Sequence, residues 1–67
     1  MNYKEIGLFI SKKRKELNMT QKDLANKLNV TDKAVSKWES EQSTPDLEKV
    51  IIMSELFEVT TDYILKG

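Results

Sequence analysis

The sequence of 67 residues contains no cysteine and no histidine. Without cysteine the chain has no disulfide bonds and no thiolate nucleophile. Without histidine as well, it lacks the residues that hold most zinc and other transition metals, and it lacks imidazole general bases. We therefore expect a chain that is stabilised by packing and that uses no metal or other cofactor.

Glycine and proline are also scarce, with two Gly and one Pro. Residues that interrupt helices are thus rare, and 33% of the residues are charged, which is typical of a small, mostly helical domain. A chain of this length buries only about 60% of the surface of its unfolded form and supports a single core. We predict one all-α domain over residues 1–67.

Long apolar runs are missing too, because no stretch approaches the ~18 residues of a membrane span. The N-terminal charges follow a short apolar stretch, unlike the order in a signal peptide. The sequence therefore predicts a cytoplasmic protein without a membrane partner, and no segment indicates a small-molecule effector.

An excess of charge of one sign is absent, since 11 basic residues balance 11 acidic ones. This balance at first argues against nucleic acid, for which a basic surface is usual. The charge is polarised, however. Residues 1–42 carry nine Lys/Arg against six Asp/Glu, whereas residues 43–67 carry two against five. The first part of the chain is the one suited to phosphate.

Apolar residues at helical spacing predict five helices. The first runs from Tyr3 to Leu17, and its apolar face consists of Ile6, Phe9, Ile10 and Leu17. The second and third span about 21–28 and 32–40. The fourth follows a break at 43–45 and carries Leu47, Val50, Ile51, Leu56 and Phe57. The fifth begins at Thr60 or Thr61.

The connection between the second and third helices has the residues of a helix-turn-helix unit. Thr20 and Thr31 can cap the two helices, and Asp23 can complete a capping box with Thr20. Asn29 stands where the turn needs a left-handed residue, a conformation that Asn adopts with little strain. Short helices joined by three or four residues cross at a steep angle, as they do in such units.

The stretch TQKDLANKLNVTDKAVSKWE, residues 20–39, resembles the Cro/phage-repressor class of helix-turn-helix proteins, also called the xenobiotic-response-element family. The flanking segments IGLFISKKRKELNMT and STPDLEKVIIMSELFEVTTDYILKG are similar to its first helix and to its fourth and fifth helices. The resemblance implies a five-helix, lambda-repressor-like DNA-binding domain. Its helix-turn-helix unit is at about 21–40, with the third helix in the major groove of double-stranded DNA.

The third helix is expected to expose the residues that remain once Val35 and Trp38 are assigned to the core. Among these residues we predict that four contact bases: Asp32, Lys33, Ser36 and Lys37. Lysine donates to guanine, Asp accepts from cytosine, and Ser does either. On an arbitrary helix such residues form only a solvated face, and for Asp32 stabilisation of the helix N-terminus is an equally good explanation.

The resemblance also implies contacts that position the domain on the DNA backbone, from Gln21, Thr31, Ser40 and Gln42. Glu41 departs from the family pattern, in which Asn-Gly is frequent at positions 40 and 41, and it brings negative charge toward phosphate. Arg14 and Glu39 match positions that the family links by a partly buried ion pair.

The C-terminal segment has more apolar residues than a small core needs. Leu56, Phe57, Val59 and Ile64 are assigned to the core, whereas Met53, Tyr63 and Leu65 are predicted to form a homodimer interface. A dimer is expected because one short helix reads few base pairs, so two subunits on half-sites ~34 Å apart are needed.

We therefore predict a sequence-specific transcriptional regulator, a repressor that occludes a promoter at a roughly palindromic operator. The alternative is a protein-interaction module that keeps the fold but has lost DNA binding. An enzyme is disfavoured, because without His or Cys a domain this small offers few catalytic groups and little concavity.

Overall fold

The computed structural model describes residues 3–59 and 63–64, and these residues form four helices. The helices are α1 (Tyr3–Glu16), α2 (Gln21–Leu28), α3 (Asp32–Glu39) and α4 (Leu47–Phe57). The all-α prediction is confirmed. The start of the expected fifth helix lies outside the described residues, but Tyr63 and Ile64 within it are helical.

The N-termini of the helices are set by capping side chains. Thr20 Oγ1 accepts a bond of 3.0 Å from the Asp23 N–H, and Asp23 Oδ2 accepts one of 2.9 Å from the Thr20 N–H. This is the predicted capping box. Thr31 caps α3 as expected, by accepting from the Ala34 N–H at 3.2 Å. Asp46 caps α4 by accepting from the Lys49 N–H at 3.0 Å, a cap that was not predicted from the sequence.

A common motif ends all four helices. In each case a residue with a left-handed φ of 57° to 69° follows the helix: Asn18, Asn29, Glu41 and Glu58. The N–H of the next residue then bonds the carbonyl five positions earlier at 2.9–3.0 Å, as Val30 does with Ala25. This is the Schellman motif, which usually has glycine at the left-handed position. The left-handed conformation predicted for Asn29 is confirmed.

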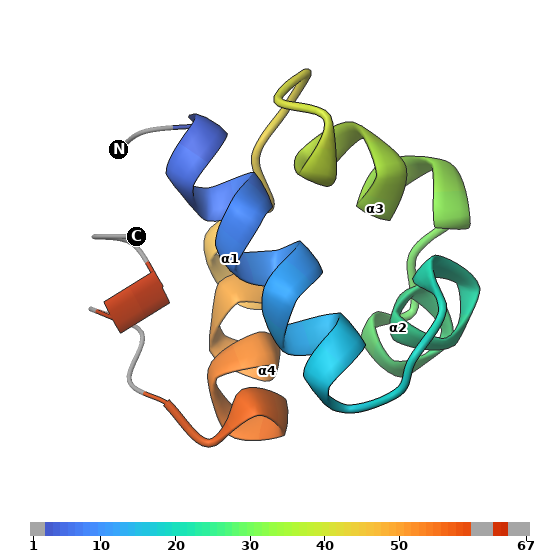
Figure 1. The fold of residues 1–67 in the computed structure, drawn as a ribbon, viewed down its shortest axis with the longest axis vertical. Helices are drawn as coiled ribbons and strands as arrows, with labels where there is room; N and C mark the ends of the chain where they lie inside the picture. The colour runs from blue at the N-terminus through green and yellow to red at the C-terminus, as the bar shows by residue number, and fades with distance from the viewer. Residues whose placement is uncertain (1–2, 60–62, 65–67) are drawn as a thin grey trace.

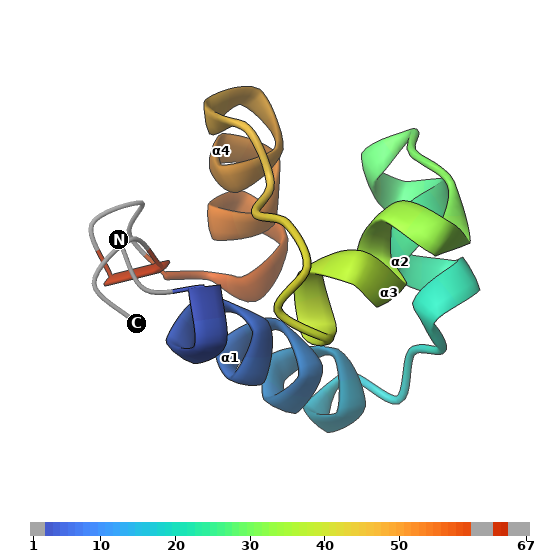
Figure 2. The same ribbon diagram turned by 90° about the horizontal axis from the view of Figure 1, so that it is seen from above.

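The core lies where the four helices face one another (Figures 1 and 2). Its largest fully buried side chains, each at most 1% exposed, are Ile6, Ile10, Leu24, Leu28, Val35, Val50, Met53 and Ile64. Phe9 packs edge-on against Phe57 and Tyr63, with ring centroids 6.1 and 5.2 Å apart. Among the described residues, no helix is long and apolar enough to cross a membrane.

Two predictions about apolar residues are wrong. Leu17, expected on the apolar face of the first helix, is 46% exposed, because α1 ends at Glu16 and the chain turns away through Asn18. Met53, predicted for a dimer interface, is fully buried. It lies three residues after Val50 and four before Phe57, so all three share the core-facing side of α4.

Gly7 allows α1 to approach the end of α3 closely. A Cβ built at Gly7 would collide with the backbone carbonyl oxygen of Trp38 and would lie 3.2 Å from that of Glu39. Hydrogen therefore has to occupy this position for the two helix backbones to touch. A glycine inside a helix costs about 1 kcal/mol relative to alanine. A glycine within the first predicted helix is therefore the feature of the sequence that could have indicated a close contact at this position.

Candidate nucleic-acid interface

The α3 helix separates buried from exposed residues as its spacing predicts. Val35 and Trp38 are 0% and 5% exposed and fix the helix on the core. Its other side is exposed and carries two cations, one acid and one hydroxyl: Lys33, Lys37, Asp32 and Ser36. The predicted exposure of these four side chains is confirmed. Their contact with bases stays a prediction.

The residues predicted to contact the DNA backbone lie at the ends of α2 and α3. Gln21 is the first residue of α2 and is partly buried, and Thr31 precedes α3 and is exposed. Ser40 and Gln42 are exposed in the loop that follows α3. The Gln42 amide donates to the Ser40 hydroxyl at 3.0 Å, so these two side chains contact each other.

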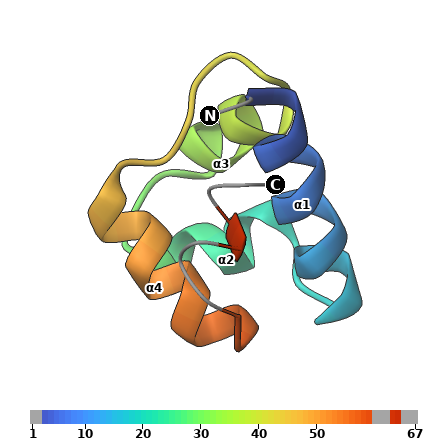
Figure 3. The same cartoon turned by 90° about the vertical axis from the view of Figure 1, so that its left-hand side faces the viewer.

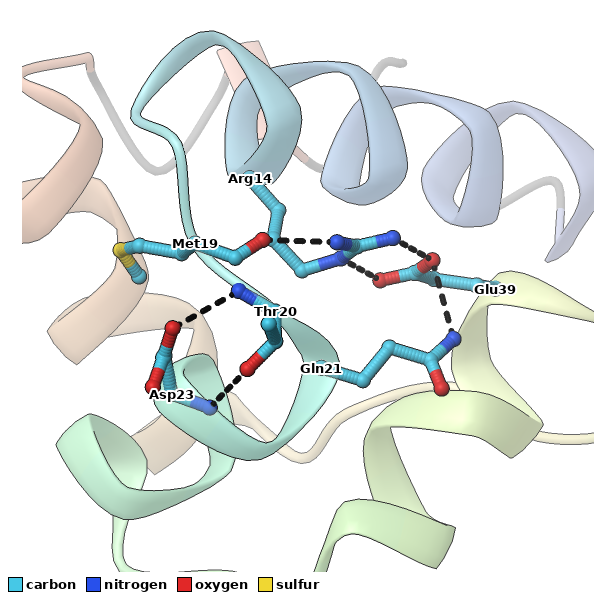
Figure 4. A network of polar contacts seen from close by, with 6 residues as sticks. All are labelled: Arg14, Met19, Thr20, Gln21, Asp23 and Glu39. Carbon is cyan, nitrogen blue, oxygen red and sulfur yellow. Dashed lines mark hydrogen bonds and ion pairs between the residues drawn. The ribbon is translucent and has the colours of Figure 1, made fainter.

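Arg14 and Glu39 form the predicted ion pair, which joins α1 to the last residue of α3 (Figure 4). Arg14 Nε and Nη2 donate to the two carboxylate oxygens of Glu39 at 2.8 and 3.0 Å. The side chains are only 12% and 9% exposed. Such a two-bond, largely buried pair fixes geometry as well as charge.

Two further contacts extend this pair into a network. Arg14 Nη1 donates to the Met19 carbonyl at 2.7 Å, in the turn before α2. Gln21 Nε2 donates to Glu39 Oε1 at 3.2 Å. This bond links the start of α2 to the last residue of α3 and so braces α3. Glu39 is therefore held by side chains from both α1 and α2.

The electrostatics of Glu39 follow from this network. Burial alone raises the pKa of its carboxyl group, but hydrogen bonds from Arg14, Gln21 and Ser11 and the charge of Arg14 outweigh it, so the pKa is lowered. The pKa of Arg14 is raised, chiefly by its hydrogen bonds to Glu39. Both groups are therefore charged at neutral pH, and the network is intact there.

Glu41 is the residue of this region that fits a DNA surface least well. It is exposed in the loop between α3 and α4, directly after Ser40, and has a φ of 69°. Its carboxylate adds negative charge beside the residues predicted to meet phosphate. Its backbone conformation is one in which a side chain costs about 1–2 kcal/mol.

Two short helices that cross through a left-handed turn, with polar side chains exposed along the second, define a helix-turn-helix domain. Residues 10–64 match the protein family described as Helix-turn-helix. The chain belongs to this family, in its Cro and phage-repressor type, whose members are DNA-binding transcriptional regulators and not enzymes.

Known relatives include a repressor and an activator. Over all of its 67 residues the chain is 33% identical to repressor protein C2 of Salmonella phage P22, of which it covers 31%. It is 44% identical to the transcriptional activator BcrR of Enterococcus faecalis over 50 residues, which are 75% of this chain and 24% of BcrR. It is 33% identical over 60 residues to the regulator ImmR of Bacillus subtilis, covering 90% of this chain and 47% of ImmR. The chain thus spans about a quarter to a half of the length of the relatives it matches.

Two solved structures have the same fold. The crystal structure of the P22 c2 repressor with the synthetic operator 9T superposes with a TM-score of 0.85 at 32% identity, over 92% of this chain and 94% of that one. The solution structure of the P22 c2 DNA-binding domain gives a TM-score of 0.84 at 33% identity, over 100% and 88% of the two chains. The lambda-repressor-like fold is therefore confirmed for the four helices.

Proposed function

We propose that residues 1–67 form one domain that reads double-stranded DNA in a sequence-specific way, with α3 in the major groove. The observation that carries this proposal is the exposed side of α3, on a helix braced at its end by Arg14 and Gln21. Bracing matters because base readout requires side chains in fixed positions. Lysines in this setting donate to guanine O6 and N7, and Ser and Asp add further contacts. The base-contacting residues are Lys33, Ser36, Lys37 and Asp32.

In this arrangement the DNA backbone is bound by Gln21, Thr31, Ser40 and Gln42. All four lie at helix ends or in the loop after α3 and offer hydroxyl or amide donors to phosphate oxygens. The polarised charge supports the same orientation, since the excess of basic residues lies in 1–42 and the excess of acidic ones in 43–67. An overall neutral chain can thus face DNA with its positive part.

We further propose that the chain acts as a homodimer on a roughly palindromic operator and represses transcription by occluding a promoter in the cytoplasm. One short helix reads few base pairs, so two copies on half-sites ~34 Å apart supply the specificity. The likeness to a repressor solved in complex with an operator supports this assignment. Of the remaining interface predictions, Tyr63 is 55% exposed, whereas Leu65 lies outside the described residues.

Selection of ligands from a pool of random duplexes tests the proposal directly. We expect a palindromic winner that binds about 10³-fold or more tightly than a scrambled duplex. Affinity for both duplexes should fall with salt, because phosphate contacts release counterions. Failure to enrich any sequence would reject specific recognition.

A protein-interaction module on the same fold is the second candidate, favoured by the zero net charge and by Glu41 beside the predicted phosphate contacts. It predicts weak binding that is equal for selected and scrambled DNA. The same selection therefore separates the two functions.

A further inference from the structure

An open pocket is lined by residues of α1 and by Tyr63. The segment that contains Tyr63 lies on the side of the molecule away from α2 and α3 (Figures 1 and 3). The pocket has a volume of about 260 Å³, and it is lined by Glu5, Leu8, Phe9, Lys12 and Tyr63. Leu8 is 59% exposed and Tyr63 is 55% exposed, so a large aliphatic and a large aromatic side chain meet solvent at its rim. Neither the predicted base contacts nor the predicted phosphate contacts line this pocket.

The charges on this side of α1 are arranged so that the surface complements itself. Glu5, Leu8 and Lys12 are three and four residues apart and therefore share one side of the helix. Glu5 and Lys12 lie at equal distances along the chain from a point between Leu8 and Phe9. A twofold axis through that point would place Glu5 of each copy opposite Lys12 of the other.

We propose that this α1 face, consisting of Glu5, Leu8, Lys12 and Tyr63, binds a second copy of the chain with the two α1 helices antiparallel. Leu8 of each copy enters the pocket of the other beside Phe9 and Tyr63. Because the contact is twofold symmetric, the Glu5–Lys12 ion pair forms twice in the dimer. The partner is a second copy of this chain, because the α1 face itself provides both the charges that pair with Glu5 and Lys12 and the leucine that fills the pocket.

The exposed apolar residues of α4 do not have this property. Leu47 and Ile51 on α4 are 63% and 44% exposed and lie one turn apart. The exposed acids Glu48 and Glu55 flank them on the same helix. A twofold contact there would bring acids of the two copies together, and like charges at an interface oppose association.

The α1 contact is small, well below the ~1,200 Å² that stable protein complexes bury, so we expect weak association of the free protein. It leaves α3 of both copies uncovered, and a pair formed in this way can hold DNA on each copy. Two copies on neighbouring sites meet at high effective concentration, where a weak contact suffices. This inference rests on the homodimer of the proposed function and names the surface through which it forms. Its test needs no DNA, so the contact and the DNA-binding function can fail separately.

Sedimentation equilibrium with charge-reversed variants tests the contact. We expect the unchanged protein to show a reversible monomer–dimer equilibrium at high concentration. Glu5→Lys and Lys12→Glu should each weaken it about tenfold, because either change turns two attractive pairs into two repulsive ones. An equimolar mixture of these two variants, and the double variant Glu5→Lys/Lys12→Glu, should associate as the unchanged protein does.

Matched reversals elsewhere control for net charge. Lys22→Glu on α2 and Glu55→Lys on α4 change the charge by the same amounts at exposed positions outside the α1 face. Each should associate like the unchanged protein, and an equimolar mixture of the two should associate no more strongly than either alone. Leu8→Ser, which changes no charge, should weaken association at least tenfold, whereas Leu47→Ser should not.

Helical circular dichroism checks that each variant is folded, and Leu8→Ser provides a second route if one charge variant is not. A monomer at every accessible concentration would overturn the proposal. So would charge reversals that associate normally when alone, or a mixture of Glu5→Lys and Lys12→Glu that recovers no more than the control mixture. Association that recovers in the mixture of Glu5→Lys and Lys12→Glu, and not in the control mixture, would establish the antiparallel contact.

Discussion

At the scale of single residues, Glu41 combines two unfavourable properties. Its left-handed φ of 69° suits glycine, and its carboxylate lies next to Ser40, at the surface proposed for phosphate. One property lowers the stability of the domain and the other its affinity for DNA. Because the two costs have different physical origins, different substitutions at this position separate them.

We predict that Glu41→Gly raises the free energy of unfolding by about 0.5–1 kcal/mol, since the relieved strain exceeds the entropy that glycine loses on folding. It should also tighten DNA binding, by an amount that shrinks as salt screens the charge. Glu41→Gln is the control: it removes the charge but keeps the side chain, so it should tighten binding without stabilising the fold. Urea denaturation and binding titrations at two salt concentrations measure both effects. Equal stability of the Gly and Gln variants would refute the strain.

The exposed lysines of α3 and the glutamine of α2 should differ in what they contribute to binding. Lys33→Ala and Lys37→Ala should each cost about 1–3 kcal/mol on the selected operator and relax the preference for sequence. Gln21→Ala should weaken both duplexes through the lost phosphate contact, which carries no sequence information. It should weaken the selected duplex somewhat more, because the change also removes the Gln21–Glu39 bond that braces α3. Binding titrations on both duplexes measure the difference. Equal losses on both duplexes for the lysine variants would show that they do not read bases.

At the scale of helices, the Arg14–Glu39 pair and Gly7 hold α1 against α3 in different ways. The ion pair acts through side chains at the C-terminal half of α1, whereas Gly7 permits backbone contact near its start. Trp38 and Glu39 thus meet α1 in two places. The end of α3 is fixed in both position and direction.

A double-mutant cycle should show strong coupling across the pair. Arg14→Met leaves the largely buried carboxylate of Glu39 without its cation and should cost about 3 kcal/mol of unfolding free energy. The double variant Arg14→Met/Glu39→Met should lose much less unfolding free energy than the two single variants lose together. The difference, measured by urea denaturation, is the coupling energy and should be about 1–3 kcal/mol. The Lys13–Glu16 pair, 3.5 Å apart and more exposed than Arg14–Glu39, is the control and should couple by no more than about 0.5 kcal/mol. Similar coupling in both cycles would mean that burial adds nothing.

Gly7→Ala should destabilise the domain although alanine favours helix. The propensity gain is about 1 kcal/mol, but the new methyl group would overlap the Trp38 carbonyl oxygen and push α1 from α3. We expect a net loss of about 1–3 kcal/mol in thermal or urea unfolding. Lys15→Ala, at an exposed position of the same helix, should be neutral or slightly stabilising. A stabilised Gly7→Ala protein would contradict the close approach.

At the scale of the whole molecule, stability should fall in acid. The lowered pKa of Glu39 means that its contribution is present above the unfolded-state pKa, about 4.3, and is lost as pH falls through the lower folded-state value. The pKa of Asp23 is lowered as well, mainly by the hydrogen bond from the Thr20 N–H, and it acts in the same direction. The urea midpoint should therefore drop below about pH 4. Glu39→Gln should reduce this pH dependence, and an unchanged pH profile would exclude Glu39 as a source.

The features that the sequence predicted well depend on neighbouring residues. The bounds of α2 followed from Thr20 and Asn29, because caps and turns are decided within a few residues. Burial was harder: Leu17 and Met53 were assigned wrongly because exposure depends on where a helix ends and which side faces its neighbours. The Arg14–Glu39 pair joins residues 25 apart and was reached only through the family resemblance. The backbone contact at Gly7 depends on how α1 and α3 pack, and the only sign of it in the sequence is a glycine inside a helix.

The position of Glu39 has a consequence for genetics. Its carboxylate receives bonds from Arg14 on the first helix and Gln21 on the second, although it is itself the last residue of the third. A screen for mutants that fail to regulate should therefore recover lesions in α1, far along the chain from the lysines of α3. Second-site revertants of such lesions are expected to cluster around Glu39, and a phenotype at codon 14 is not evidence that Arg14 meets DNA.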